Sequence, residues 1–196
     1  MSGVPEIRTE RLTLRGWTDD DRASYAAVNA DPLVMATLGP LMSREESDAH
    51  VDHMMSKWAE RGYGLWCVDL DGECIGFTGL NAPWFDTDFT RATAAAGYPC
   101  VEVGWRIASH HWGRGFAPEA ALASLQYAWH ELALPEIYSW TADSNDKSRR
   151  VMTKVGMAHD ESITFVHPGV RPGWEHLNPH VVYRIKNPGR PPRSGR

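Results

Sequence analysis

The stretch VGWRIASHHWGRGFAPEA, residues 103–120, decides the fold predicted for this chain. Its first residues continue the strand-like run VEVGWRI of residues 101–107. Pro118 and Glu119 then open a helix, because proline and acidic residues favour the first helical turn. The residues between, WGRGFA at 112–117, place two glycines and unpaired backbone N–H groups at a helix N-terminus. Such a turn can hold an anion, since backbone amides and the helix dipole both favour negative charge.

Spacing alone leaves two interpretations of this glycine stretch. It is either an anion-binding turn or a tight strand-to-helix turn without a ligand. The stretch lacks the third glycine of a dinucleotide-binding fingerprint and the Gly-Lys-Ser/Thr ending of a P-loop. The sequence therefore argues against both of these nucleotide-binding motifs.

The N-terminal part predicts a strand followed by a helix. Residues 11–17, RLTLRGW, alternate apolar and polar side chains as a half-buried strand does. Thr18 and the three aspartates after it favour the start of a helix that runs to about Asn29. Pro32 is expected to stop this helix.

A second helix and a hairpin follow. Ser43 and Glu46 form an S-x-x-E capping box for a helix that continues to about Arg61, where Gly62 can adopt the left-handed conformation that ends it. The Asp-Gly pair at 71–72 lies between the runs LWCVDL and ECIGFTGL, which predicts two antiparallel strands joined by a two-residue turn.

The remaining elements predict an α/β protein. Residues 81–99 lose periodicity and are a candidate lid. We expect a helix from residue 118 to about 132, a strand at 137–142, a helix at 145–155 closed by a glycine, and strands at about 158–167 and 179–185. The chain is therefore expected to form one domain, residues 1–186, with a mixed sheet of about seven strands and about four helices. Residues 187–196, rich in proline and arginine, are expected to be a disordered tail.

Composition excludes several classes of function. The formal net charge is -5 and the pI is near 6.0, so the protein lacks the positive field that drives binding to nucleic acid. No run approaches the roughly 20 apolar residues that span a bilayer, and the N-terminus has no apolar core of the signal-peptide kind. We expect a cytoplasmic protein with no membrane partner.

The cysteines and histidines suggest no metal site. Cys67, Cys74 and Cys100 are an odd number without C-x-x-C spacing, so we expect reduced core thiols. His110 and His111 are adjacent at a strand end, where neighbouring side chains point in opposite directions. We therefore expect no metal.

Four segments together resemble motifs of the GNAT superfamily of N-acetyltransferases, and their residues are most similar to those of its Rim-type branch. They are TERLTLRGWTDDD, GECIGFTGL, VGWRIASHHWGRGFAPEA and NDKSRRVMTKVGM, which occur in the family's order and cover about residues 9–183. The resemblance implies a sheet whose two central parallel strands splay apart, and acetyl-coenzyme A (acetyl-CoA) bound in the gap.

The resemblance also implies which residues hold the cofactor. The pantetheine arm would bond to backbone near Ile107 and Ala108, and Asn145 would contact it from the neighbouring strand. The pyrophosphate would rest on the N–H groups of Gly113, Arg114, Gly115, Phe116 and Ala117, with the Arg114 side chain free to reach a phosphate. Trp112 stands where the superfamily often has Gln or Arg, as is usual in the Rim-type branch.

Catalysis requires a base, because an alkylamine is largely protonated at neutral pH. Glu102 lies on the strand that leads to the glycine stretch, where the superfamily often carries a general base. An outward-facing Glu102 paired with a basic neighbour is the alternative, and Asp160 and Glu161 are the next candidates. Met152 occupies the position of the tyrosine that protonates the leaving thiolate in many relatives, so Ser148 is the candidate acid or, alternatively, an ordinary helix cap.

The acceptor site is the least specified part of the sequence. Trp84, Phe85, Asp86 and Trp174 lie in irregular loops and are candidate acceptor contacts, although they could equally pin a loop to the core. We expect transfer to a primary amine, either a protein N-terminus or a small molecule. The alternative is a non-catalytic sensor of acyl-CoA. A homodimer is also expected, because relatives often pair.

Overall fold

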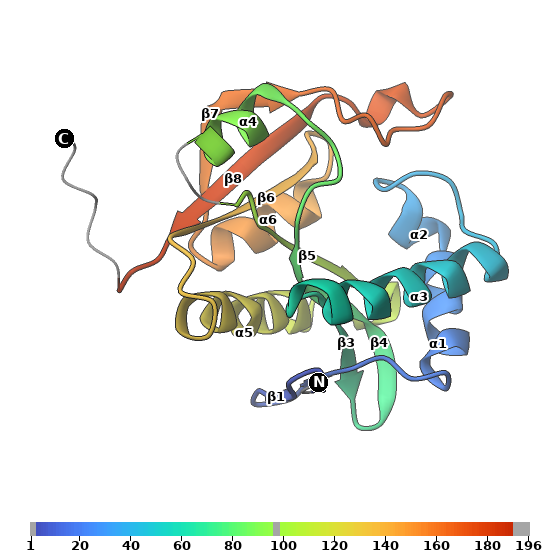
Figure 1. Ribbon diagram of the computed structural model, residues 1–196. Helices are drawn as coiled ribbons and strands as arrows, with labels where there is room; N and C mark the ends of the chain where they lie inside the picture. Colours follow the sequence, from blue (N-terminus) through green and yellow to red (C-terminus); the bar gives the residue numbers. More distant parts are fainter. Residues whose placement is uncertain (1–2, 96–98, 190–196) are drawn as a thin grey trace.

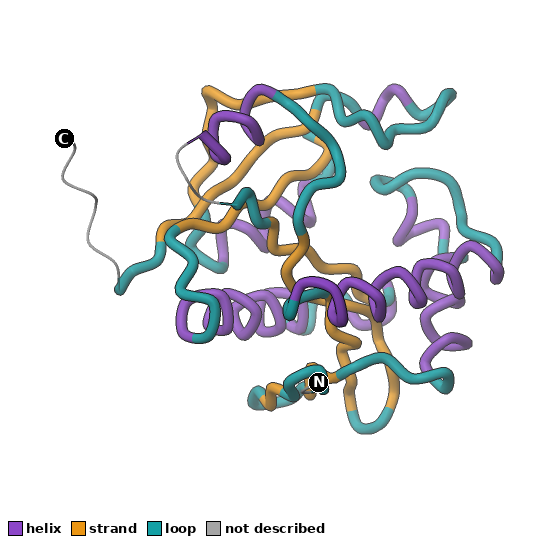
Figure 2. The backbone as a smooth tube through the Cα atoms, in the orientation of Figure 1, coloured by secondary structure: helices purple, strands orange, loops and turns teal. Residues whose placement is uncertain are grey.

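The computed structural model describes residues 3–95 and 99–189, which form a mixed sheet with helices against it (Figure 1). The strands are β1 Ile7–Arg8, β2 Thr13–Arg15, β3 Leu65–Leu70, β4 Glu73–Asn81, β5 Glu102–Ile107, β6 Glu136–Ala142, β7 Ala158–Phe165 and β8 His180–Lys186. The α-helices are α1 Asp21–Asn29, α2 Pro32–Met35, α3 Arg44–Arg61, α4 Asp88–Ala95, α5 Phe116–His130 and α6 Asp146–Lys154, and Ser109–His111 and Glu175–Leu177 form 3₁₀ turns. Figure 2 shows the same backbone in the same orientation, with helices, strands and the loops that join them in different colours.

The centre of the sheet opens between β5 and β6. The strand order is β1-β2-β3-β4-β5-β6-β8-β7, and β5 and β6 run parallel whereas the other neighbours are antiparallel. Within the described residues, these two strands pair only at Glu102 and Tyr138, where the Tyr138 N–H donates to the Val101 carbonyl at 2.9 Å. Beyond this point the strands diverge, as the splayed arrangement requires.

The two faces of β5 have different neighbours. Val101 and Val103 are fully buried against Ala121 and Leu125 of α5. Since side chains alternate along a strand, Glu102, Gly104 and Arg106 lie on the opposite face, toward α1 and α3. One side of β5 therefore belongs to the apolar core, and the other carries the acidic side chain of Glu102 and the basic side chain of Arg106.

The short-range predictions are confirmed. Ser43 and Glu46 form both bonds of the capping box of α3, and Gly62 ends that helix with φ of 72°. The hairpin between β3 and β4 turns at Asp71 and Gly72, with φ of 54° and 90°. The strand, turn and helix predicted from residues 103–120 are present, although α5 begins at Phe116.

Other predictions were incomplete. The described residues contain eight strands and six α-helices, not seven and four. Pro32 does not merely stop α1: it is the first residue of α2, because the Asp31 carboxylate accepts from the Leu33 N–H and caps a new helix. The side chain of Thr18 does not cap α1. Instead, the Asp21 carboxylate accepts from the Thr18 N–H and hydroxyl.

The candidate lid differs from expectation. Residues 88–95 of the predicted irregular loop form α4. The predicted strand at 179–185 is β8, and Asn187, the first residue of the expected tail, donates from its side chain to the Leu134 carbonyl at 3.0 Å. Residues 190–196 of the predicted disordered tail lie outside the described residues. Across residues 3–95 and 99–189, the helices are too short or too polar to cross a membrane.

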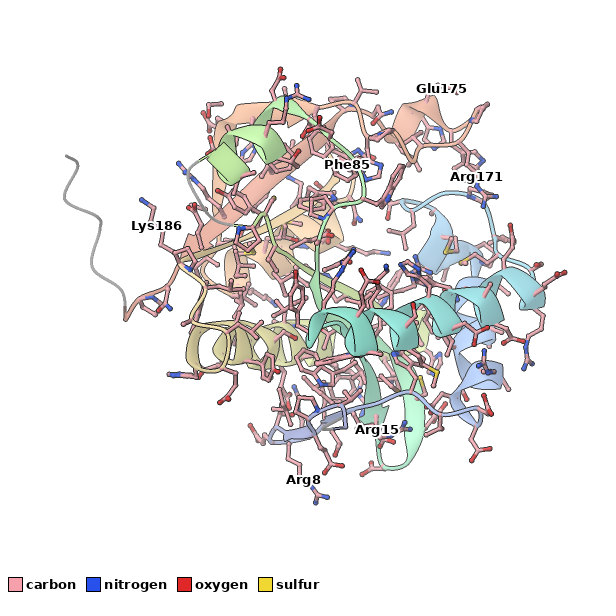
Figure 3. All side chains as sticks on the ribbon, in the orientation of Figure 1. Arg8, Arg15, Phe85, Arg171, Glu175 and Lys186 are labelled. Atoms are coloured by element: carbon pink, nitrogen blue, oxygen red, sulfur yellow. The ribbon has the colours of Figure 1, made fainter. Side chains whose placement is uncertain are left out.

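One ion pair links distant parts of the chain. Arg171, on the loop between β7 and β8, lies with Nη2 3.4 Å from Oε1 of Glu46 at the start of α3 (Figure 3). Both side chains are largely exposed, so this contact contributes little stability.

Candidate functional site

A cavity of about 810 Å³ occupies the gap between β5 and β6. Its walls include residues 104–107 of β5, residues 139–141 of β6, the glycine stretch, one face of α6 along its whole length, and α2. Glu102 lies where the two strands part. The cavity therefore joins a possible anion site to a carboxylate.

The glycine stretch has the backbone that its sequence predicts. Gly113 and Gly115 have φ of 77° and 84°, a region that favours glycine. Gly115 is the N-cap of α5 and offers no side chain to the first amides of the helix. The first backbone bond back into this turn is that of the Glu119 N–H to the Gly115 carbonyl, at 3.2 Å. The earlier amides are open to an anion.

Most of the predicted cofactor residues line this cavity. They are Ile107, Trp112, Gly113, Gly115, Phe116, Ala117, Asn145 and Ser148. Ala108 and Arg114 do not line it. The Arg114 guanidinium instead lies 3.1 Å from Nδ1 of His111 and 4.7 Å from the centre of the Phe116 ring.

The backbone near the end of β5 is partly engaged. The Ile107 carbonyl accepts from the Trp112 indole at 2.8 Å, and the Ala108 N–H donates to the Ile75 carbonyl at 2.9 Å. The Val101 carbonyl accepts from β6, and the main-chain groups of every second residue along a strand point in the same direction. The N–H and C=O of Trp105, four residues after Val101, therefore point into the gap between β5 and β6. Trp105 is thus the backbone position most open to an extended ligand.

Glu102 is half-buried and lines the cavity. A Cβ at Gly104 would lie 4.0 Å from Oε1 of Glu102, so the carboxylate lies over the glycine. Burial raises the pKa of Glu102 to about 8. Among the described residues its carboxylate takes part in none of the ion pairs. The alternative, an outward-facing Glu102 paired with a basic neighbour, would require such an ion pair.

The other two candidate bases, Asp160 and Glu161, lie elsewhere. Asp160 accepts from the Ser162 hydroxyl and pairs with Arg184 at 3.0 Å. The Ser162 hydrogen bond holds the pKa of Asp160 below its usual value. Neither Asp160 nor the exposed Glu161 lines the cavity.

Asn145 and Ser148 meet at the start of α6. The Asn145 side chain accepts from the Ser148 N–H at 3.1 Å and donates to the Thr141 hydroxyl at 3.0 Å. The cap of α6 is therefore Asn145, not the Ser148 hydroxyl. Met152, at the position of the family's tyrosine, is fully buried in the core.

The four predicted acceptor residues do not line the cavity. The Phe85 ring lies 5.6 Å from that of Trp140, which does line it. Trp84 is 70% exposed, Asp86 pairs with Arg91 at 2.7 Å, and Trp174 lies beside His176. Only Phe85 is thus connected to the cavity wall.

Sequence reasoning missed a basic row on α6. Lys147, Arg150 and Lys154 all line the cavity, and the Lys147 ammonium lies 3.7 Å from the centre of the Trp112 ring. Their spacing places them on one helix face, a signal that was available in the sequence. The contributions of α2, His50 and Arg106 were also missed, because only the tertiary fold brings them to the cavity.

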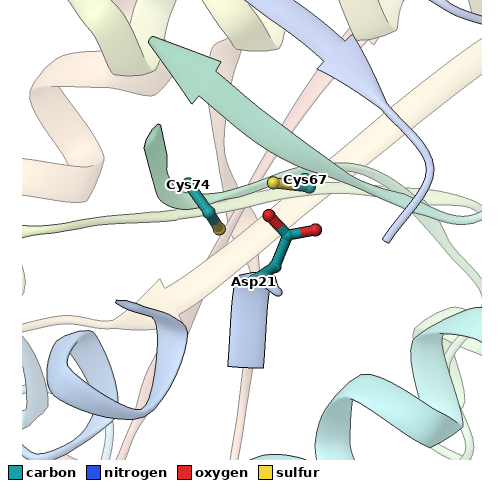
Figure 4. A group of neighbouring side chains, drawn as sticks. All are labelled: Asp21, Cys67 and Cys74. Atoms are coloured by element: carbon teal, nitrogen blue, oxygen red, sulfur yellow. The ribbon is translucent and has the colours of Figure 1, made fainter. Parts of the chain in front are cut away.

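Ligating atoms of Asp21, Cys67 and Cys74 lie within 4.8 Å of one another (Figure 4). The Asp21 carboxylate already accepts from Arg15 at 2.7 and 2.8 Å. A cation there would lie against the Arg15 guanidinium and compete for the same oxygens. The group is better described as a buried polar cluster under α1.

Glu73, His110 and His111 form a second such group. The expectation that the two histidines point apart was wrong: their 3₁₀ turn brings the ring centres to 4.2 Å. Arg114 donates to Nδ1 of His111, so the proton of the neutral ring resides on Nε2. In this arrangement neither ring nitrogen of His111 offers a free lone pair to a cation, which argues against a metal here.

Comparisons with known proteins agree with this geometry. The family model described as an acetyltransferase (GNAT) domain matches residues 11–158. The Aspergillus fumigatus FsC-acetyl coenzyme A-N(2)-transacetylase is 29% identical over 185 residues, covering 89% of this chain and 74% of that protein. The Bacillus subtilis uncharacterized N-acetyltransferase YnaD is 37% identical over 155 residues, covering 79% and 83%. A crystal structure of an Agrobacterium tumefaciens acetyltransferase, 30% identical, matches with a TM-score of 0.72 over 94% of this chain and 96% of that one. The chain therefore belongs to the GNAT family and is an acetyl-CoA-dependent acyltransferase.

Proposed function

We propose that this protein transfers the acetyl group of acetyl-CoA to a primary amine by direct attack, with Glu102 as the general base. The observation that carries the proposal is the single cavity shared by the open amides of the glycine stretch and the half-buried Glu102. The name of the fungal relative, which specifies acetyl-CoA and transfer to nitrogen, supports the same chemistry.

The positions of the glycine stretch, the basic row of α6 and Glu102 support one course for the donor. Its diphosphate would accept hydrogen bonds from the amides of residues 113–117, and the basic row of α6 would face its remaining phosphate. The pantetheine arm would follow the open main chain of Trp105. This course brings the thioester to the point where β5 and β6 part, beside Glu102.

The reaction balances without another reactant. The neutral amine nitrogen attacks the thioester carbonyl carbon, the C–S bond breaks, and the amine proton passes to the Glu102 carboxylate directly or through a water. Coenzyme A leaves as a thiolate. The Ser148 hydroxyl lines the cavity and is the candidate proton donor to that sulfur, and it regains a proton from solvent.

Positioning supplies much of the rate. Holding two reactants in register lowers a barrier by roughly 7 to 11 kcal/mol, whereas a thiolate is already a fair leaving group. We therefore expect Ser148 to matter less than Glu102. The acceptor class, a protein N-terminus or a small molecule, is refined below.

Two measurements test this function. Calorimetry with acetyl-CoA tests donor binding, and release of free thiol in the presence of a panel of amines tests transfer. Binding without amine-dependent thiol release would favour the acyl-CoA sensor, and absence of binding would overturn both.

We also propose a homodimer in the cytoplasm. The sheet ends in β1 and β7, and terminal strands of this kind can join across a two-fold axis. Light scattering after size exclusion would contradict the dimer if it gave only the monomer mass.

A further inference from the structure

Arg106 is a cation in the cavity wall to which the proposed chemistry assigns no role. It lies on the same face of β5 as Glu102, with Gly104 between them, and all three line the cavity. This face is opposite to α5, whose N-terminus supplies the amides for the diphosphate. Arg106 therefore belongs to the side of the cavity that faces α1 and α2.

The partners of the Arg106 guanidinium among the described residues are neutral. Nη1 donates to Oδ1 of Asn29 and lies 3.6 Å from Sδ of Met42, and the group lies 5.5 Å from the centre of the Phe77 ring. Nε is buried and has no hydrogen-bond partner in the part of the chain that the structure describes. None of the ion pairs formed by residues 3–95 and 99–189 includes Arg106.

Among the described residues, the side chains packed against the Arg106 guanidinium supply no compensating negative charge. The Tyr25 hydroxyl lies 2.8 Å from Nδ1 of His50, and burial, followed by the charge of Arg106, lowers the pKa of His50 to about 3. Burial raises the pKa of Tyr25. Both side chains are neutral near pH 7, so the positive charge of Arg106 is left to a ligand.

We propose that Arg106 binds a carboxylate on the acceptor, so that the substrates are amines that also carry a carboxylate, as amino acids do. This inference rests on the proposed acetyl transfer. A half-buried guanidinium without a counter-ion costs free energy, and a carboxylate that reaches it gains a charge-assisted hydrogen bond from Nη2.

The spacing along β5 suits such a molecule. Four residues of strand place the Cα atoms of Glu102 and Arg106 about 13 Å apart, and their side chains can lean toward each other over Gly104. An amine held at Glu102 and a carboxylate held at Arg106 would thus belong to one short chain. The carbon chain between them would face apolar Val34 and Leu38 in the cavity wall.

The test compares matched acceptors on the full chain. Free thiol is measured with acetyl-CoA and 3-aminopropanoate, 4-aminobutanoate or 6-aminohexanoate, each against the alkylamine of the same length. We expect kcat/KM to be at least about tenfold higher for the carboxylates, as one charge-assisted bond would give. In Arg106→Gln the ratio of kcat/KM for the aminocarboxylate to kcat/KM for the alkylamine should fall to near one, because KM for the aminocarboxylate rises. Arg106→Lys keeps a positive charge and should keep part of this preference.

Controls separate this role from folding and from donor binding. Arg44→Gln removes an exposed guanidinium that pairs with Asp48 on α3, and it should leave the ratio unchanged. Circular dichroism and calorimetry with acetyl-CoA should give the same fold and donor affinity for Arg106→Gln as for the parent protein.

Each contrary outcome has a distinct meaning. If alkylamines and aminocarboxylates were turned over equally, or if the aminocarboxylates were not turned over at all, the carboxylate site would be overturned. Turnover of the alkylamines in the same assay would leave the proposed acetyl transfer intact. Loss of acetyl-CoA affinity in Arg106→Gln would make Arg106 a donor residue and also overturn the proposal. Failure of the parent protein to bind acetyl-CoA would instead refute the proposed function itself.

Discussion

The Arg11 guanidinium holds the Glu119 carboxylate 108 residues later in the chain, with Nε 2.7 Å from Oε2. A second arm of the same guanidinium donates to the Arg114 carbonyl at 2.7 Å, and the group lies 4.7 Å from the centre of the Phe116 ring. One side chain thus ties the N-terminal segment to both the glycine stretch and the first turn of α5.

We predict that Arg11→Gln destabilises the fold by about 1 to 2 kcal/mol, since charge-assisted bonds are lost at a partly exposed site. At this chain length, that loss corresponds to a melting temperature lower by roughly 2 to 8 °C. Acetyl-CoA affinity should fall as well, because the glycine stretch loses its support. Arg8→Gln breaks a largely exposed pair with Glu6 and is the matched control. Equal melting curves for the two variants would contradict this role.

Replacing Glu102 by Gln should reduce turnover by about 10² to 10⁴, the usual contribution of a general base. Donor affinity measured by calorimetry should stay close to that of the parent, because the carboxylate is expected to face the acceptor. Ser148→Ala should cost about tenfold or less, since a thiolate needs little help to leave. A larger loss in Ser148→Ala than in Glu102→Gln would reverse the assignment.

The pH dependence of kcat/KM follows from the raised pKa of Glu102. Burial brings that pKa to about 8, so the carboxyl is largely protonated at pH 7 and becomes a base as pH rises through about 8. We expect kcat/KM to increase through this range.

Stability should show the opposite dependence. A folded pKa above the unfolded value means that stability present at low pH is lost as pH rises through about 8. Glu102→Gln should therefore melt close to the parent near pH 4 and above it at pH 9. A constant difference across this range would show that burial does not raise the pKa.

Local signals could be predicted from the sequence because they act within a few residues. The capping box of Ser43 and Glu46, the turn at 71–72 and the left-handed glycines of 112–117 each depend on their own neighbours. Pro32 was ambiguous, since proline both ends one helix and starts another, and Asp31 decides for the start.

Long-range relationships could not be predicted in the same way. In the sequence, Arg11 and Glu119 are ordinary charged residues, and their ion pair forms only because the fold brings them together. Phe85 and Trp84 share a loop composition that fits either a binding surface or an aromatic cluster, and only the packing of Phe85 on Trp140 distinguishes these. The position of Glu102 on the cavity side of β5 required both the strand alternation and the location of α5.

The basic row of α6 should set the salt dependence of donor binding. Arg150→Gln and Lys154→Gln should each weaken acetyl-CoA binding, and the loss should shrink as salt rises, because screening reduces the attraction in the parent. Lys57→Gln, on α3 and paired with Glu60, is the control for general charge. Calorimetry at two salt concentrations checks this, and an equal effect of Lys57→Gln would point to net charge instead.

Asn145 combines two roles that two variants can separate. Asn145→Ala loses the cap of α6 and should cost about 1 kcal/mol of stability, as helix caps usually do. Asn145→Asp keeps an oxygen to accept from the Ser148 N–H, so most of that stability should return. Its carboxylate, however, adds negative charge to the cavity that receives the donor's phosphates, and acetyl-CoA affinity should fall in Asn145→Asp below that of Asn145→Ala. If both variants bound acetyl-CoA equally, the phosphates would not pass near the start of α6, and the proposed course of the donor would be wrong.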